Sequence, residues 1–429
     1  MSLKCRLLIA ACLLATTIEF TWLGSEDVNG ALTYAGRLTG VTFLAAALLE
    51  LFASGTLLAG RPSTPGKISG YPAAAVALGV FASFFANLAL LVLQIENLSL
   101  SMGLLVWPSL TAWSLIALVI IHREHEAGNF SIPNLQVFKA GAIAAALIAL
   151  VNFGYTQIYQ PYATPAQIST TVEIGMAHID HGTVSVPIHL ASKNTGSVGV
   201  YILGSLYQVT AGKAVYSDAA RTGRDWLQDI NNGQIDLLKY QNEGNRGYQL
   251  LAQGRFMRQG RKLDPGAEVA SDKIIQFPVG NHYDVLNATG DVVYLRTDRA
   301  VLTSEEYETS GRSSWHKDKS HSPEMEAPGW VAHKGVETFK YQSPIVHSNA
   351  ELQHTRSPRN VTLWWVLEDP QKSWNGPYLV ATIASAGEEN KRPDPARPQQ
   401  LSDEYGLDHS SSGRAQKSIE QITGSTKTN

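Results

Sequence analysis

The charged residues of this chain are distributed so unevenly that they divide it into two parts. Residues 1–160 hold only 14 of the 71 Asp, Glu, Lys and Arg residues, and residues 161–429 hold the rest. A long segment with so few charges is a poor soluble domain and is suited to lipid. The second part is long enough for one folded domain with insertions and a tail. A net charge of −3 argues against a nucleic-acid partner.

Apolar segments in the first part are long enough to cross a bilayer. A transmembrane helix needs about 20 mostly apolar residues. The sequence meets this length five times, at 7–23, 38–60, 71–95, 100–121 and 140–159. We therefore expect a membrane α-helical bundle of five transmembrane helices over residues 1–160, with the lipid bilayer as its first partner.

The basic residues of this bundle gather at alternate ends of the expected helices. Six of the seven follow this pattern, namely Lys4, Arg6, Arg61, Lys67, Arg123 and Lys139, and Arg37 alone lies on the other side. The positive-inside rule predicts a multi-pass plasma-membrane protein with a cytoplasmic N-terminus. An odd number of spans then places the C-terminal part outside the cytoplasm.

Residues 161–385 show the alternation of apolar and polar residues that is typical of half-buried strands. Seven strand candidates are 168–174, 183–190, 198–209, 274–279, 292–302, 361–367 and 378–384. The second and third flank the turn sequence Asn194-Thr195-Gly196 and are expected to form a hairpin. Pro187 places its strand at an edge or a bulge. With a small helical insertion near 219–230, the pattern favours an all-β, immunoglobulin-like sandwich outside the membrane.

Two polar stretches do not fit a compact sandwich. Residues 303–357 are rich in Ser, His, Lys, Glu and Pro, so we expect a polar excursion from the domain. Residues 386–429 have few large apolar residues and many prolines, serines and charges. This composition predicts a disordered tail.

Several short features occur together in a characteristic order. Tyr155, Tyr159 and Tyr162 follow the last expected span, Lys193-Asn194-Thr195-Gly196-Ser197 ends a strand, and Leu263-Asp264-Pro265-Gly266 forms a later turn. Over about residues 1–300 the chain resembles bacterial multi-pass membrane proteins with a C-terminal extracytoplasmic β-sandwich domain. Those proteins have no known activity, so the resemblance implies a membrane location and no site.

Glu50 lies near the centre of the second expected span. A carboxylate at mid-bilayer costs about 2.5–3.5 kcal/mol on insertion scales, so it must face the bundle interior, be protonated or have a partner. Polar residues at a similar depth are Ser83, Asn87, Ser109 and Asn152. They predict an intramembrane polar layer that serves an ion, a proton or a small polar ligand. Hydrogen bonding between helices is the structural alternative.

Two further groups of polar residues are candidates for an ion pair and for a metal site. Glu19, nearer the outer end of the first span, is expected to form an interfacial ion pair with Arg37. His178, Asp180 and His181 are weak candidates for a metal site, because in an extended chain only the first two share a face. An exposed turn is the other interpretation, and no metal or cofactor is expected.

The sequence contains no nucleotide-binding, hydrolase or paired-cysteine motif, so an enzyme is not expected. The first hypothesis is an integral membrane protein that presents its β-sandwich for binding, assembly or sensing with a protein partner, or with copies of itself. The alternative is a small transporter, channel or accessory subunit that works through Glu50.

Overall fold

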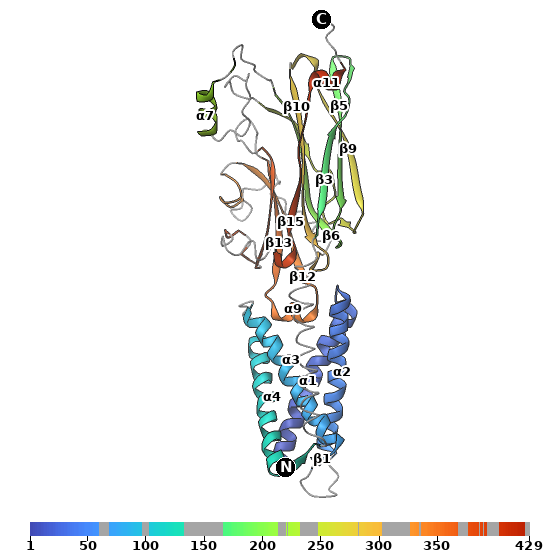
Figure 1. The fold of residues 1–429 in the computed structure, drawn as a ribbon, viewed down its shortest axis with the longest axis vertical. Coiled ribbons are helices and arrows are strands. Elements are labelled where there is room, and N and C mark those ends of the chain that lie inside the picture. Colours follow the sequence, from blue (N-terminus) through green and yellow to red (C-terminus); the bar gives the residue numbers. More distant parts are fainter. Residues whose placement is uncertain are drawn as a thin grey trace, which may run out of the picture. The chain divides into compact units, whose positions relative to one another are not determined.

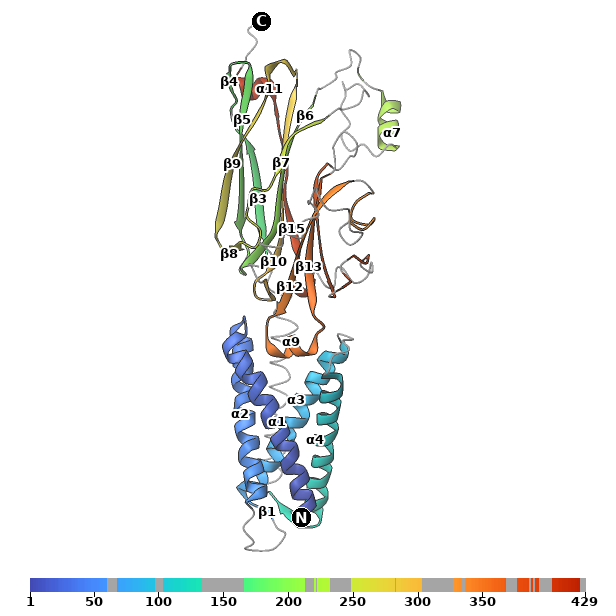
Figure 2. The same ribbon diagram turned by 180° about the vertical axis from the view of Figure 1, so that it is seen from behind.

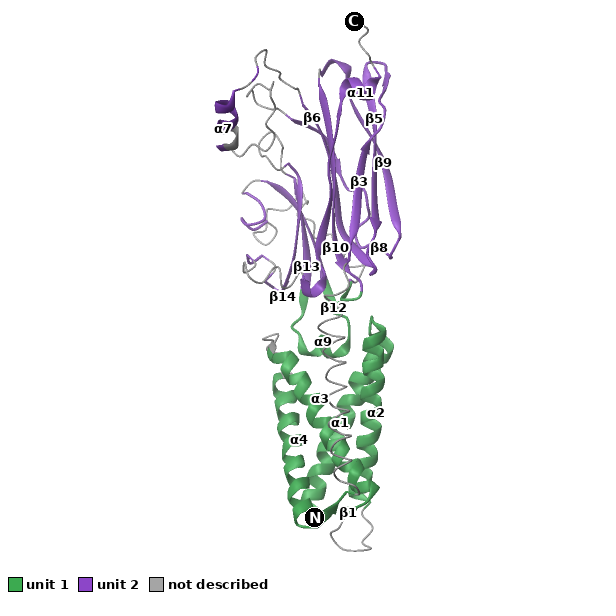
Figure 3. Ribbon diagram, in the orientation of Figure 1, with its two compact units in different colours: residues 1–164, 298–301, 344–359 green, residues 165–297, 302–343, 360–429 purple. Residues whose placement is uncertain are grey.

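The computed structural model divides the chain into two compact units (Figure 3). It describes residues 1–59, 68–96, 103–132, 166–212, 220, 222–231, 248–281, 283–302, 327–333, 336–367, 376–385, 387–388, 390–392 and 403–424. Unit 1 comprises residues 1–164, 298–301 and 344–359, and unit 2 the other residues. Each unit is described by itself.

Unit 1 contains four long helices that form a bundle (Figure 1). They are α1 (Leu3–Gly30), α2 (Tyr34–Leu58), α3 (Tyr71–Glu96) and α4 (Gly103–Glu126). All four are long and apolar enough to cross a membrane. They overlap the first four expected spans almost completely, and the expected span 140–159 lies outside the described residues. The described residues of the first part of the chain therefore form four helices that are long and apolar enough to be membrane spans.

Close packing of α1 against α2 depends on glycine. A Cβ atom added to Gly24 would lie 2.8 Å from the carbonyl oxygen of Gly40, and one added to Gly40 would lie 2.7 Å from Cβ of Asp27. Small residues allow helix backbones to approach closely in a membrane, where van der Waals packing stabilises helix pairs. These glycines thus hold α1 and α2 together near the end of the bundle at which α1 ends.

The opposite end of the bundle is tied by short contacts. Strand β1 (Ile68–Ser69) pairs in parallel with β2 (Phe130–Ser131). The amino group of Met1 lies 3.2 Å from Oε2 of Glu124. Side chains from both strands and from α1 to α4 share an apolar cluster.

Unit 2 contains two antiparallel sheets with a common core (Figure 2). One has the order β15-β10-β6-β7, with β8 also paired to β6; in the other, β5 pairs with β3 and β4 and also with β9. The strands of the first sheet are β6 (Val200–Gly212), β7 (Gln249–Gly254), β8 (Lys262–Leu263), β10 (Val285–Arg296) and β15 (Asp408–Ser418). Those of the second are β3 (Ile168–Ile174), β4 (His178–Asp180), β5 (Thr183–Asn194) and β9 (Glu268–Pro278).

The core between these sheets follows from alternation along the strands. On β5, Val184, Val186, Ile188 and Leu190 are buried while the residues between them are more exposed. Side chains of β6 and β10 complete the same cluster. The expected β-rich region is present, and the immunoglobulin-like classification stays a prediction.

The expected hairpin is wrong. β5 and β6 are consecutive in the chain but lie in different sheets, so the turn after Asn194 carries the chain across the core. Alternation cannot distinguish a hairpin from such a crossing, because both need one apolar face. β5 is also not an edge strand, because it pairs with β9 along one side and with β3 and β4 along the other. Pro187 pairs with Ile274 of β9. On the opposite side of β5, Pro187 faces the gap between the end of β3 and the start of β4. The bulge interpretation thus fits Pro187.

A further sheet in the chain has the order β11-β12-β13-β14. Its strands are β11 (Ala300–Leu302), β12 (Glu337–His347), β13 (Arg359–Leu367) and β14 (Tyr378–Ser385). Trp364 of β13 is fully buried against Val331, Ala332 and Val366. Helices α7 (Gly223–Asn231), η2 (Val279–Asn281), α9 (Ala350–Thr355) and α11 (Ile419–Thr423) are short. α7 overlaps the expected helical insertion.

Two expectations for the polar stretches need correction. Within 303–357, residues 303–326 lie outside the described part, but β12 and α9 are regular elements. Within the expected disordered tail 386–429, β15 pairs with β10 along nearly its whole length, and Ile422 of α11 is buried in the sandwich core. A backbone ladder needs no apolar alternation in β15, so the composition gave no signal for this strand.

Candidate functional site in the helix bundle

Glu50 lies on α2 with none of its surface exposed. Oγ1 of Thr16 on α1 donates to its Oε2 atom at 2.8 Å, and Oγ of Ser83 on α3 donates to its Oε1 atom at 2.5 Å. The two hydroxyl oxygens are 3.1 Å apart. The three side chains therefore close a triangle that joins three helices.

This triangle can adapt to either protonation state of Glu50. The hydroxyl of Thr16 also lies 3.1 Å from the carbonyl oxygen of Cys12, and that of Ser83 lies 3.0 Å from the carbonyl oxygen of Gly79. A hydroxyl has one proton to donate and two lone pairs to accept with. Both hydroxyls can donate to an ionised Glu50. When Glu50 is protonated, the hydroxyl beside its O–H can turn to its own helix carbonyl and accept from it, while the other hydroxyl still donates.

Glu19 and Asn87 lie one helical turn along from this triangle. Glu19 follows Thr16 by three residues on α1, and Asn87 follows Ser83 by four on α3, so each shares a helix face with a triangle member. Glu19 is 8% exposed, and neither of its carboxyl oxygens accepts a hydrogen bond from a described residue. Asn87 is fully buried; its Nδ2 donates to the carbonyl oxygen of Ser83, and its Oδ1 has no described partner.

Neither buried carboxyl group has a cationic partner among the described side chains. Ion pairs between described residues of unit 1 include Met1–Glu124, His122–Glu126 and Glu26–His354, and none of these involves Glu19 or Glu50. An isolated carboxylate is very costly in a low-dielectric interior, so it takes up a proton or binds a cation. The arrangement of Glu19, Glu50 and Asn87 can therefore hold protons or a small cation.

The structure brings together only part of the expected polar layer. Ser83 and Asn87 lie with Glu50, as described above. Ser109 is exposed on α4, where its hydroxyl donates to the carbonyl oxygen of Leu105, and it does not belong to the layer. Asn152 lies outside the described residues. Thr16 was missed, because an isolated threonine in an apolar helix usually bonds to its own helix.

The expected ion pair between Glu19 and Arg37 does not form. Glu19 faces the bundle interior, whereas Arg37 is exposed and its Nε atom donates to the carbonyl oxygen of Ala31. Helical periodicity explains the difference, because Glu19 shares the face of Thr16 and Leu23, which are both fully buried.

The candidate metal residues lie at an exposed turn. His178 and Asp180 are in β4, and His181 follows them with a positive φ of 44°. Nε2 of His181 lies 3.5 Å from Oδ1 of Asp180, and both side chains are well exposed. Over the described ranges, no group of three or more His, Cys, Asp or Glu residues could hold a metal ion.

A second polar cluster of unit 1 involves residues 348–358, which connect β12 to β13 and are called here the β12–β13 tip. α9 lies in this tip and belongs to the same unit as the helices (Figure 3). The N–H of Ala350 donates to Oδ1 of Asp27 at 2.6 Å, and the N–H of Leu32 donates to the carbonyl oxygen of Ser348 at 2.9 Å. Ala350 also packs with Leu23, Leu90 and Trp107 in an apolar cluster. The tip is thus docked at the end of the bundle where α1 ends.

Charged groups surround this docking point. Nε2 of His354 lies 2.9 Å from Oε2 of Glu26, and its ring centroid is 4.3 Å from that of Trp22. Glu351 is 1% exposed, and burial together with the neighbouring Asp27 carboxyl raises its pKa well above the ordinary value. Burial, with Arg356 and Arg359 nearby, lowers the pKa of His347 to about 3. Burial therefore disfavours the charged forms of Glu351 in the tip and of His347 beside it.

Comparisons with known proteins give no family. No protein-family model and no curated protein matches the chain. Among solved structures, a Bordetella pertussis protein assigned the name ApaA is 11% identical, with a TM-score of 0.19, and the match covers 31% of this chain and 82% of that one. Spo0M, a sporulation control protein from Bacillus subtilis, is 11% identical, with a TM-score of 0.18, and the match covers 52% of this chain and 91% of that one. At these TM-scores neither fold nor function is taken from either protein.

Proposed function

We propose that this chain is a plasma-membrane protein that uses its extracytoplasmic β-region to sense or bind a partner protein. The N-terminus lies in the cytoplasm, following the positive-inside rule. In this orientation the loop between α2 and α3, at 59–67, lies on the cytoplasmic side and is too short for a domain of its own, so an inward signal passes through the helices.

The observation that carries this proposal is the docking of the β12–β13 tip. Strands β12 and β13 are neighbours in a sheet, and the segment that joins them bonds to α1 through Asp27 and Glu26. A partner that shifts this hairpin changes contacts at Asp27. The docked tip belongs to the same unit as the helices, and its chain continues into β12 and β13.

In vivo photo-crosslinking of the full-length chain tests partner binding. A photoreactive residue replaces Ile274 of β9, which is 68% exposed, and, as a control, Ile188 of β5, which is fully buried. We expect a discrete crosslinked product with another protein at position 274 and none at position 188. The absence of a product at 274 and at other exposed strand positions such as Ile179 would contradict the proposal.

Ion or proton transport is the second candidate, and the two unpaired oxygens of Glu19 favour it. A purely structural carboxyl group in a membrane is expected to find donors, as Glu50 does. In this function, Glu19 and Glu50 exchange protons or a small cation within the bundle.

Proton uptake by proteoliposomes tests the second candidate. Glu50→Gln and Glu19→Gln are expected to lower the uptake rate by about tenfold or more, because each removes one carrier carboxyl group. Ser109→Ala is the matched control, since this hydroxyl lies outside the triangle. Equal uptake by the wild type and both variants would exclude the role of the carboxyl groups.

A further inference from the structure

Unit 2 carries a concentration of positive charge in one connection between two strands. In the eight residues from Arg255 to Lys262, four side chains are cationic, and this segment connects β7 to β8. The overall charge of −3 conceals it. A run of cations in a connection is usually only solvated surface, so the question is whether the backbone holds these side chains in a fixed arrangement.

The connection is fixed by one serine and by its own apolar residues. Oγ of Ser205, on β6, accepts hydrogen bonds from the N–H groups of Phe256 and Met257 at 3.2 and 2.8 Å, and lies 3.1 Å from the carbonyl oxygen of Met257, to which it donates. Phe256 and Met257 are 7% and 3% exposed and belong to the sandwich core. The N–H of Gly260 and the carbonyl oxygen of Arg261 both pair with Ile202 at 2.8 Å. The connection is thus anchored on both sides of Arg258.

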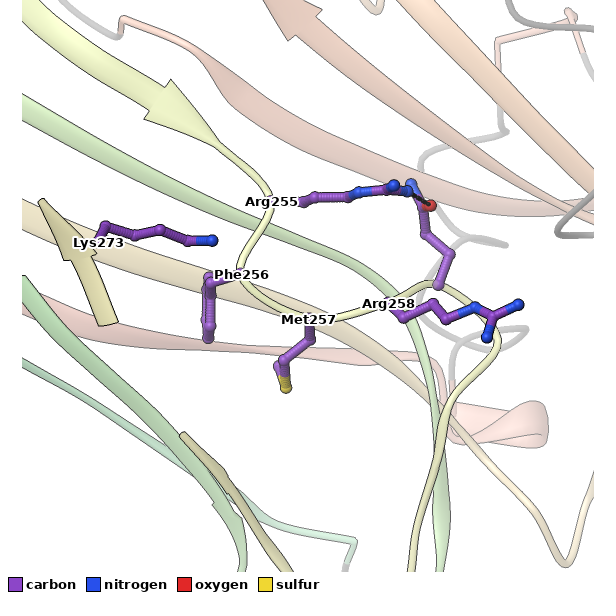
Figure 4. A pocket seen from close by; sticks show the side chains of 6 residues that line it. Arg255, Phe256, Met257, Arg258 and Lys273 are labelled. Carbon is purple, nitrogen blue, oxygen red and sulfur yellow. Dashed lines mark hydrogen bonds between the residues drawn. The ribbon is translucent and has the colours of Figure 1, made fainter. Parts of the chain in front are cut away.

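A pocket of about 440 Å³ opens over this anchored segment (Figure 4). Its lining consists of Arg255, Phe256, Met257, Arg258, Gln259 and Lys273. Three of these side chains are cations and none is acidic. The volume lies within the range of about 300–1,000 Å³ that is typical of small-molecule sites.

Gln259 is the buried polar group of this pocket. It is 6% exposed, and its Oε1 atom accepts a hydrogen bond from Nη1 of Arg255 at 3.0 Å. This bond orients the amide and leaves the two N–H groups of Nε2 without an acceptor among the described residues. An acceptor-rich ligand would satisfy them.

The acidic residues closest in sequence are committed to other cations. Asp264 lies 3.1 Å from Nζ of Lys262, and Asp272 lies 2.7 Å from Nδ1 of His189. Lys273, the residue after Asp272, forms no ion pair with a described residue; its Nζ atom lies 5.9 Å from the ring centroid of Tyr207. Two cations of the lining, Arg255 and Lys273, therefore form no ion pair with a carboxylate of the part of the chain that the structure describes.

We propose that this pocket binds a small organic oxyanion carrying two or more phosphate or carboxylate groups. The guanidinium group of Arg255 can pair with both oxygens of such a group, Lys273 adds a point charge for a second group, and the amide of Gln259 donates to a further oxygen. Phe256 and Met257 provide the apolar floor. This inference is independent of the proposed functions of the bundle.

Titration calorimetry of the full-length protein in phosphatidylcholine nanodiscs tests the site, with pyrophosphate and citrate as probes. We expect saturable binding of at least one probe at low salt, weakened by about tenfold in Lys273→Gln and Arg255→Gln, because each removes a charge-assisted contact. Lys193→Gln, an exposed lysine on β5, is the charge-matched control and should change Kd by less than about twofold. Absence of saturable binding, or an equal loss in the control, would overturn the proposal.

Gln259→Glu gives a second test that does not depend on removing a cation. The variant keeps the shape and can pair with Arg255, so the fold is expected to persist while the added charge abolishes anion binding. Unchanged binding in a folded Gln259→Glu variant would also overturn the proposal. Adding phosphatidylglycerol to the nanodiscs identifies the source of the anion. A raised Kd for the probe would assign a lipid headgroup phosphate, and an unchanged Kd a soluble anion.

Discussion

The helix bundle and the β-region differ in where their charged groups without an ion-pair partner lie: they are buried carboxyl groups in the bundle and more exposed cations in the β-region. In the bundle, Glu19 and Glu50 are almost fully buried with no cation beside them. In the β-region, Arg255 and Lys273 line a pocket with no acidic lining residue, and neither forms an ion pair with a described residue. A charge costs much in a low-dielectric interior and little at a hydrated surface. The buried carboxyl groups therefore depend on their hydrogen-bond donors for stability, whereas the exposed cations remain available for a ligand.

This comparison predicts its largest effect at the hydroxyl groups that serve Glu50. The double variant Thr16→Val, Ser83→Ala removes both donors and leaves the carboxyl group buried without partners. We expect the free energy of unfolding to fall by about 3–5 kcal/mol, since hydrogen bonds to charged groups contribute roughly 1.5–3 kcal/mol each. Equilibrium unfolding of the full-length protein in mixed micelles measures it. Ser109→Ala, which removes an exposed hydroxyl, should change stability by less than about 0.5 kcal/mol, and a similar loss in both would break the comparison.

Glu19 is expected to respond in the opposite direction. Its carboxyl group is buried and accepts no described hydrogen bond, so Glu19→Leu replaces a poorly satisfied group with an apolar side chain of similar size. The free energy of unfolding should rise by about 1–3 kcal/mol. The same micelle unfolding assay measures the change. A large destabilisation would contradict this expectation. It would show that the carboxyl group of Glu19 stabilises the fold through a bonded partner, instead of lowering the stability in favour of a function.

The sequence predicts the parts of this molecule whose signals are local. Apolar length alone identifies the first four spans, and alternation identifies β3 with the bounds Ile168–Ile174. The central carboxyl group was also evident, because Glu50 interrupts an apolar run. In each case neighbouring residues contain the whole physical reason.

Other elements depend on contacts between distant residues. Thr16 looks like any helix threonine until Glu50 is placed beside it. The β12–β13 tip is polar in composition, yet its docking depends on Asp27, more than 300 residues away in the chain. The helix signal was present, since Asn349 is the N-cap and Glu351 lies in the first turn of α9. Its binding site on α1 could not be read from that signal.

A smaller, pH-dependent effect is expected at the tip. The pKa of Glu351 is raised in the folded protein, so its contribution is fully present below the ordinary value of about 4.5 and is lost as the pH rises through the folded value. Glu351→Gln removes this dependence, and the variant should become more stable than the wild type by about 1–2 kcal/mol toward pH 8. His347 acts in the opposite sense: its lowered pKa contributes stability above about 6.5 that is lost as the pH falls toward 3.

The difference in melting temperature between Glu351→Gln and the wild type, measured from pH 5 to pH 8, isolates the carboxyl group from His347. His347, Glu26 and His354 are unchanged between the two proteins, so their titration cancels. A constant difference across this range would show that Glu351 titrates normally and that its burial against Asp27 has no consequence for the tip.

The smallest effect on stability is expected at the basic pocket, and it completes the contrast with the bundle. Arg255 is exposed, and its guanidinium group bonds to Gln259 but to no described carboxylate. Arg255→Gln should therefore change the free energy of unfolding by less than about 0.5 kcal/mol, because an exposed cation gains little from folding. Chemical denaturation of the wild type and the variant, with and without pyrophosphate, measures the change in stability caused by the substitution and the stabilisation caused by the ligand. A loss above about 2 kcal/mol without ligand would make Arg255 a structural support for Gln259, and the two regions would then no longer differ in how they use unpaired charge.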